Sequence, residues 1–359
     1  HSEREVLLFH CLKELSGGKF EESLLLVEDY LSQYPRDAMG LKLQNDICYF
    51  TGQNFRMRDG VARCLPEMDE ETPFYGYILG MYAFVLEESF EYDKAQEFAQ
   101  MALQRNSKDV WAIHALAHTL EMQGKAEEMI RLLIESKDNW EHSNLRCHIS
   151  WHLALSYLDL GQYEQGLSVY DTQIASNIEF LGVFALVDCT QLLQRFEFEG
   201  LKVGDRWEAV WPRWMKHAGD HRLSFNDAHI ALAVGASEDP VVQKEALHSW
   251  EKFCSDSKDD SRTSHVNLRN VCVPLLRAIL AYRTSRFVDC VRELLRIRYH
   301  LYVIGGSNAQ REIFFLLLIR ACLATKNKKF LSLVKQLVNE KMASGTQSMM
   351  MKRLLASVA

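Results

Sequence analysis

The 359-residue chain has little proline, little glycine and no long apolar run. Its 6 Pro and 18 Gly exclude collagen-like and Pro/Gly-rich disordered chains, which need these residues in large amounts. The longest uninterrupted apolar run, residues 313–319, is far shorter than the roughly 20 residues of a membrane-spanning helix. Because 48% of the residues are hydrophobic, the composition predicts a soluble globular protein with a substantial core.

The chain also lacks an excess of basic charge and any closely spaced cysteine pair. It has 41 Lys and Arg against 48 Asp and Glu, so the formal net charge is −7, which argues against nucleic-acid binding. The arginines that gather at 277–298 are expected on a solvated helix face. The nine cysteines include no C-x-x-C and favour a reducing compartment. We therefore predict a cytoplasmic protein with no cofactor and with neither a nucleic-acid nor a membrane partner.

What is present is helical periodicity with a long-range repeat. Apolar residues recur every three or four positions, as in WHLALSYLDLG at 151–161, and alternating strand patterns are almost absent. A helix-breaking turn returns at steps of 34 to 38 residues, a period typical of helix-pair repeats. These turns are centred on Gly18, Gly52, Phe90, Gly124 and Gly161. Looser copies follow near residues 200, 235, 285 and 328.

This pattern predicts an all-α fold, an α-solenoid of tetratricopeptide-like helix pairs. We expect about nine hairpins curled around a concave groove, since each pair must hide an apolar face against its neighbours. Residues 1–175 form the regular part of the predicted array. Residues 176–359 continue it as diverged helical repeats.

Several polar blocks are more specific than the repeat. They are GMYAFVLEE at 80–88, WAIHALAHTLEMQG at 111–124, CHISWHLAL at 147–155, YDTQI at 170–174, GDRWEAVWP at 204–212, FNDAH at 225–229 and IRYHLYVIGGSNAQRE at 297–312. Together they resemble the tetratricopeptide repeat protein 38 family. The resemblance implies a helical-repeat fold, a cytoplasmic setting, a poorly defined activity and a further N-terminal segment. Family members tend to have His at Asn45 and Asn at Ile149, so we expect a divergent member or paralogue with its own ligand.

One helix face carries most of the candidate chemistry. Trp111, His114, His118 and Glu121 follow at spacings of three, four and three, which places them on one face of a helix. In this type of repeat that face lines the concave surface. The equivalent face of other repeats adds further side chains. The candidate catalytic residues are His114, His118, Glu121, His148 and His229, and the candidate ligand-binding residues on the same face are Tyr77, Glu87, Trp111 and Trp151.

Other candidates lie beside this face or farther along the chain. His152 is expected toward the packing side, with Asp188 or Asp171 as its orienting carboxylate. Asn226 and Asp227 precede His229 and could contact a ligand, but the expected role of Asn226 is to cap its helix. In the segment GGSNAQRE, Ser307 and Gln310 match a capping box. Asn308 and Arg311 follow at the same helix N-terminus, which is a natural seat for a carboxylate or phosphate.

The histidines leave three functions open. They could hydrogen-bond neighbouring helices or line a groove that binds a peptide or a small polar molecule, perform acid–base chemistry with Glu, or bind a metal ion. We assign no metal ligands, because H-E-x-x-H is absent and an isolated H-x-x-x-H is common on amphipathic helices. The main hypothesis is a helical-repeat protein that binds a small polar molecule or peptide segment in a pocket lined by His, Glu and Trp. The alternatives are an acid–base enzyme on the same scaffold and a protein-assembly scaffold.

Overall fold

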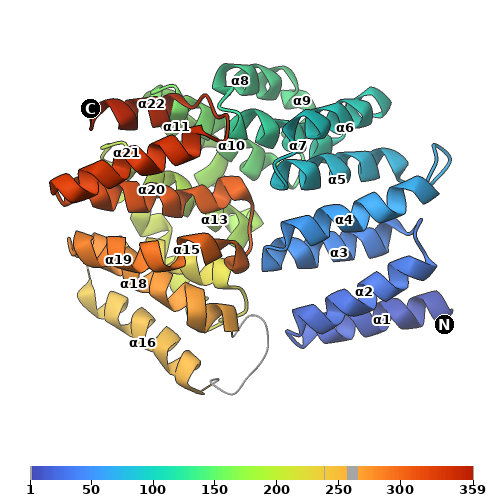
Figure 1. Ribbon diagram of the computed structural model, residues 1–359, viewed down its shortest axis with the longest axis horizontal. Coiled ribbons are helices and arrows are strands. Elements are labelled where there is room, and N and C mark those ends of the chain that lie inside the picture. The colour runs from blue at the N-terminus through green and yellow to red at the C-terminus, as the bar shows by residue number, and fades with distance from the viewer. Residues whose placement is uncertain (1, 238, 257–265, 359) are drawn as a thin grey trace.

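The computed structural model describes residues 2–237, 239–256 and 266–358. In these residues every regular element is a helix, and the helices follow one another as nine pairs and a final helix (Figure 1). The predicted all-α solenoid of helix pairs is confirmed. None of the helices in the described ranges is both long and apolar enough to span a membrane.

The first five pairs keep the repeat most regularly. Two short elements, η1 (Leu65–Glu67) and α9 (Lys137–Trp140), lie between them. The paired helices are α1 (Glu3–Ser16) with α2 (Phe20–Gln33), α3 (Ala38–Thr51) with α4 (Asn54–Cys64), α5 (Tyr75–Glu88) with α6 (Tyr92–Arg105), α7 (Val110–Met122) with α8 (Ala126–Glu135), and α10 (Arg146–Asp159) with α11 (Tyr163–Val169).

The later pairs are less regular. Short turns η2 (Tyr170–Ile174) and η3 (Ala175–Asn177) and a one-turn helix α12 (Ile178–Leu181) precede them. The remaining elements are α13 (Val183–Phe198), η4 (Gly204–Ala209), α14 (Trp211–Met215), α15 (Ser224–Gly235), α16 (Pro240–Asp256), η5 (Leu268–Cys272), α18 (Val273–Arg283), α19 (Phe287–Ile297), η6 (Arg298–Ile304), α20 (Asn308–Ala324), α21 (Lys328–Met342) and α22 (Met349–Ala356).

The repeating turns share a left-handed backbone. All five predicted turn residues have φ between 66° and 76°. Four of them are glycines, which adopt this conformation without steric cost, and the fifth is Phe90. Ser285 and Lys326 take the same conformation in later pairs. The sequence period therefore marks the place where the first helix of each pair ends.

The first helices of successive pairs pack side by side along the inside of the curl. Their small residues Ala83, Ala117 and Ala154 are fully buried, which lets α5, α7 and α10 approach closely. Asp109 starts α7 by accepting hydrogen bonds from the backbone N–H groups of Trp111 and Ala112. Register and spacing together fix which side chains of α7 and α10 meet.

The C-terminal helices close the curl. Helix α20 contacts α7 and α13 in addition to its neighbours in sequence (Figure 1). At two glycine turns the backbone of the N-terminal pairs lies against the backbone of the C-terminal segments. A Cβ on Gly52 would lie 1.7 Å from Tyr302 O, and one on Gly124 would lie 2.3 Å from Ser348 N. Any side chain at these two positions would displace backbone. As a result, α20 lies against α7 and, through the hydrogen bond from Asn308 N to Glu88, against the end of α5. These first helices carry the face that the sequence predicted to line a groove.

Candidate functional site

Four histidines converge from two neighbouring helices. His114 and His118 come from α7, His148 and His152 come from α10, and one ring nitrogen of each lies within 4.8 Å of the others. The spacing of four places each pair on one face of its helix. The second pair follows the first by 34 residues, which is one repeat step. The repeat geometry therefore stacks the two pairs against each other.

Two carboxylates orient two of these rings. The Nδ1 atom of His152 lies 2.5 Å from Glu121 Oε2, and that of His148 lies 2.9 Å from Asp188 Oδ1. When the carboxylate is ionised, such a bond fixes the proton on Nδ1 and leaves the lone pair on Nε2. The expected pairing of Asp188 with His152 is wrong, because Asp188 on α13 reaches the neighbouring His148. Asp171 pairs instead with Arg206.

Most of the other ring nitrogens have no protein partner. Within the described ranges, neither nitrogen of His114 or His118 is hydrogen bonded, and neither is Nε2 of His152. Glu87 Oε2 lies 3.4 Å from His118 Nδ1 without hydrogen-bond geometry. Burial lowers the pKa of His118 to about 3 and holds the pKa values of His114 and His152 well below their ordinary value. These imidazoles are therefore neutral at pH 7 and present lone pairs.

The adjacent Glu87 and Glu88 have different environments. Both are fully buried, and burial raises the pKa of each to about 8. The backbone N–H of Asn308 donates to both carboxylate oxygens of Glu88, at 2.9 and 3.0 Å, and Asn54 Nδ2 donates at 3.0 Å. Arg311 Nη2 lies 3.7 Å away. By contrast, neither oxygen of Glu87 has a hydrogen-bond partner among the described residues.

The carboxyl group of Glu88 thus occupies the position at the start of α20 where the sequence predicted binding of a carboxylate or phosphate. The predicted capping box is confirmed, since Ser307 Oγ accepts from Gln310 N at 3.1 Å and Gln310 Oε1 accepts from Ser307 N at 3.0 Å. Arg311 donates to the carbonyl oxygens of Gly305 and Gly306 and, at 2.7 Å, to Asn308 Oδ1. The hydrogen bonds from Asn308 to Glu88 hold the start of α20 against the end of α5.

Aromatic rings wall the four-histidine cluster. Trp151 stacks on His148, with ring centroids 5.1 Å apart and planes inclined by 11°. Trp111 lies 5.2 Å from His114, and Phe84 contacts both His114 and His118. His148 is the most accessible of the four histidines, with 17% of its side chain exposed. The aromatic side of the cluster is therefore apolar, and the low dielectric there strengthens electrostatic interactions inside the cluster.

The structure places other predicted site residues outside the cluster. His229 on α15 bonds Phe225 O through Nδ1 at 2.6 Å and Gln191 Nε2 through Nε2 at 2.9 Å, so both of its nitrogens are satisfied. Asp227 accepts from Trp250 Nε1 at 2.9 Å and bonds His221 at 3.1 Å. Tyr77 is half exposed, and its hydroxyl accepts from Asn106 at 3.4 Å.

The predicted cap at Asn226 is wrong. Helix α15 starts at Ser224, so Asn226 already lies inside its first turn, and the N-cap residue Leu223 makes no side-chain cap. The Asn226 N–H bonds Leu223 O at 3.0 Å. Ligand binding by Asn226 stays a prediction.

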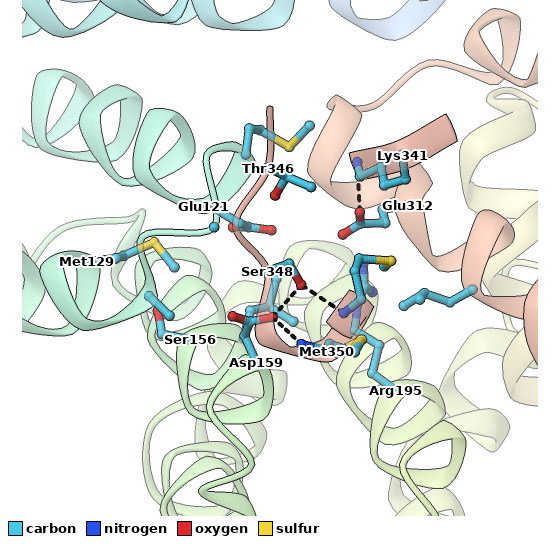
Figure 2. A pocket seen from close by; sticks show the side chains of 16 residues that line it. Glu121, Met129, Ser156, Asp159, Arg195, Glu312, Lys341, Thr346, Ser348 and Met350 are labelled. Carbon is cyan, nitrogen blue, oxygen red and sulfur yellow. Dashed lines mark hydrogen bonds and ion pairs between the residues drawn. The ribbon is translucent and has the colours of Figure 1, made fainter. Parts of the chain in front are cut away.

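A small cavity of about 50 Å³ is lined in part by Glu121, the residue that bonds His152 of the four-histidine cluster. Figure 2 shows Glu121 facing the ion pair of Glu312 with Lys341, which is 2.8 Å long, and Arg195 entering from α13. Ser348 Oγ donates to Asp159 Oδ1 at 2.6 Å, so the C-terminal segment is fastened across the cavity. Burial, reinforced by Glu312, raises the pKa of Glu121 well above its ordinary value. The cluster is thus shielded from solvent on this side.

A larger groove of about 930 Å³ runs between the turns of the N-terminal pairs and the helices η6, α20 and α21. Glu88, Arg311 and Glu312 contribute to its lining. Between 49% and 71% of each of four further lining side chains is exposed, and these are Phe55, Phe90, Tyr299 and Tyr302. Sequence reasoning missed this groove because segments that are far apart in the sequence form its walls. One signal was available in the sequence: Phe90 is an aromatic residue at a turn position where four other repeats have glycine.

No family model matches the chain. Among solved structures, the chain is similar to the tetratricopeptide repeat domain of P58(IPK), with 11% sequence identity over 90% of this chain and 99% of that domain and a TM-score of 0.25. The helix pairs of this chain, their left-handed turns and their small packing residues are those of a tetratricopeptide-like helical repeat.

Proposed function

We propose that the protein binds an extended peptide segment of a partner protein in the aromatic groove. The conformation of Phe90 carries the proposal, because its φ is 66° where four equivalent turns have glycine. A left-handed conformation costs a non-glycine residue about 1 kcal/mol. The rings of Phe90 and Tyr92 are nearly perpendicular, with their centroids 6.5 Å apart. More than half of the Phe90 side chain is exposed. Strained residues gather at functional sites.

The composition of the groove indicates the kind of segment. Its apolar surface is contributed largely by aromatic side chains, and a contiguous exposed patch of this type marks an interaction surface. Its cations are already paired within the protein, Arg298 with Glu340 and Lys341 with Glu312, both at 2.8 Å. A peptide with aromatic or aliphatic anchors therefore fits the groove better than a strongly charged one.

The other hypotheses from the sequence have less support. An acid–base enzyme requires a substrate to reach the histidines, and His114, His118 and His152 are buried. A small polar ligand held by Arg311 would compete with Glu88. Membership of the tetratricopeptide repeat protein 38 family, which the polar sequence blocks suggest, is compatible with peptide binding but does not specify the partner.

The test begins with selection of a binder for the full chain from a phage-displayed library of random peptides. The selected peptide is synthesised, and its affinity is measured by fluorescence anisotropy for the wild type, Phe90→Gly and Tyr299→Ala. We expect each substitution to weaken binding about tenfold or more, as aromatic anchors do. Phe90→Gly should at the same time leave the free energy of unfolding unchanged or raise it by up to about 1 kcal/mol, since the strain is relieved.

Phe184→Ala is the matched control. This aromatic side chain is 76% exposed on α13 and does not line the groove, so its loss should leave binding unchanged. The proposal is wrong if the wild type selects no peptide, or if the selected peptide binds Phe90→Gly and Tyr299→Ala as tightly as it binds the wild type.

A further inference from the structure

We propose that His114, His118, His148 and His152 bind one divalent transition-metal ion of the zinc type. The ion would link α7 to α10 beneath α20. This inference rests on the four-histidine cluster and is independent of the aromatic groove.

The ring nitrogens of these histidines have the properties of metal ligands. Within the described residues, five of them are buried without a hydrogen-bond partner, a costly arrangement when nothing compensates it. Zinc–nitrogen bonds of about 2.0–2.1 Å place tetrahedral ligand atoms about 3.4 Å apart. Side-chain rotations that move each nitrogen by about 1 Å would bring atoms that now lie within 4.8 Å to this separation.

The carboxylates around the cluster match the second shell of a metal site. Histidine ligands usually donate their other N–H to a carboxylate, which fixes the tautomer. Ionised Glu121 would accept such a bond from His152, and ionised Asp188 would accept one from His148. Glu87 contributes an unpaired carboxylate 3.4 Å from His118. In their ionised forms, these three groups would compensate the charge of a divalent cation.

The donor set also indicates the class of ion and its role. Imidazole nitrogen favours zinc, copper, nickel, cobalt and iron over magnesium and calcium, which prefer oxygen. Four protein ligands fill a tetrahedral shell, and structural zinc sites are closed in this way, whereas catalytic sites leave a position for water. The buried position of the cluster fits a structural ion.

His229 shows that burial alone does not create such a site. It is as completely buried as His118, yet each of its ring nitrogens has a protein partner. A substitution of His229 is therefore a matched control for a substitution of His118. The pair separates loss of a metal ligand from loss of a buried imidazole.

The test uses the full chain after treatment with a chelator, with circular dichroism as the check that it remains helical. Co²⁺ is then titrated, its visible absorption reports tetrahedral nitrogen coordination, and mass spectrometry counts bound metal. We expect one Co²⁺ per chain, displaced by one Zn²⁺. His118→Gln should weaken binding by more than about 100-fold, whereas His229→Gln should bind as the wild type does.

Two results would overturn the proposal. In the first, the folded, chelator-treated wild type takes up neither Co²⁺ nor Zn²⁺, a result that depends on no variant. In the second, His118→Gln binds both ions with wild-type affinity. If His118→Gln does not fold, the partly exposed His148 takes its place, and His148→Gln must lose the same binding.

Discussion

Two groups of buried histidines lie on the inner helices, and they differ in what their nitrogens contact. On α15 and the segment before it, the rings of His221 and His229 bond Asp227, Ser249, Phe225 and Gln191. On α7 and α10, five ring nitrogens find no partner in the described chain. Buried polar atoms in proteins are nearly always hydrogen bonded. From this difference we infer that His221 and His229 stabilise the fold, whereas the histidines of α7 and α10 bind a ligand.

The largest loss of stability is expected from substituting a histidine whose ring nitrogens are both hydrogen bonded. His229→Ala should lower the free energy of unfolding by about 3 kcal/mol, because it leaves a cavity and removes the partner of Gln191. Urea denaturation with and without Zn²⁺ measures this loss. The loss should be the same in both conditions. A loss confined to the Zn²⁺-loaded protein would instead place His229 in the metal site.

Zinc should raise the free energy of unfolding by a similar amount, and only through the four histidines of α7 and α10. At a free Zn²⁺ concentration about 100 times the Kd, the wild type should gain about 2.7 kcal/mol in free energy of unfolding. His118→Gln should gain nothing, and His229→Ala should gain as much as the wild type does. Thermal or urea unfolding of the three proteins is the measurement. An equal gain in His118→Gln would assign the stabilisation to another site.

Smaller effects should follow from the orienting carboxylates. Glu121→Gln and Asp188→Asn keep the shape of the side chain but weaken the hold on His152 and His148. Each should reduce Co²⁺ affinity about 10- to 100-fold, as second-shell substitutions do. Asp227→Asn changes the equivalent partner of His221 and serves as the control, with unchanged affinity. Equal effects of all three substitutions would remove the distinction between the two groups.

The fold was accessible from the sequence because its signals are local. The five turn residues of the regular N-terminal repeats adopt the left-handed conformation, and the small residues that set the helix register are buried. Closure by α20 was not accessible. It depends on contacts such as Gly306 N to Tyr49 O, at 3.2 Å, between segments that have no common pattern.

The candidate site was predicted in part. The helical register placed His114, His118 and His148 on the inner face, but it assigned His152 to packing. The second H-x-x-x-H at 148–152, one repeat step after the first at 114–118, is the signal that could have identified the full cluster. The missing hydrogen bonds could not be predicted, since they depend on where Glu121, Asp188 and α20 lie in space.

The central claim is that the four imidazoles are ligands of one metal ion. Anomalous X-ray diffraction at the zinc edge tests it most directly, on crystals of the full chain grown with one equivalent of Zn²⁺. We predict one dominant peak, about 2.0–2.1 Å from one nitrogen each of His114, His118, His148 and His152. No peak at the cluster, with the zinc bound instead at surface histidines such as His142, would contradict the account.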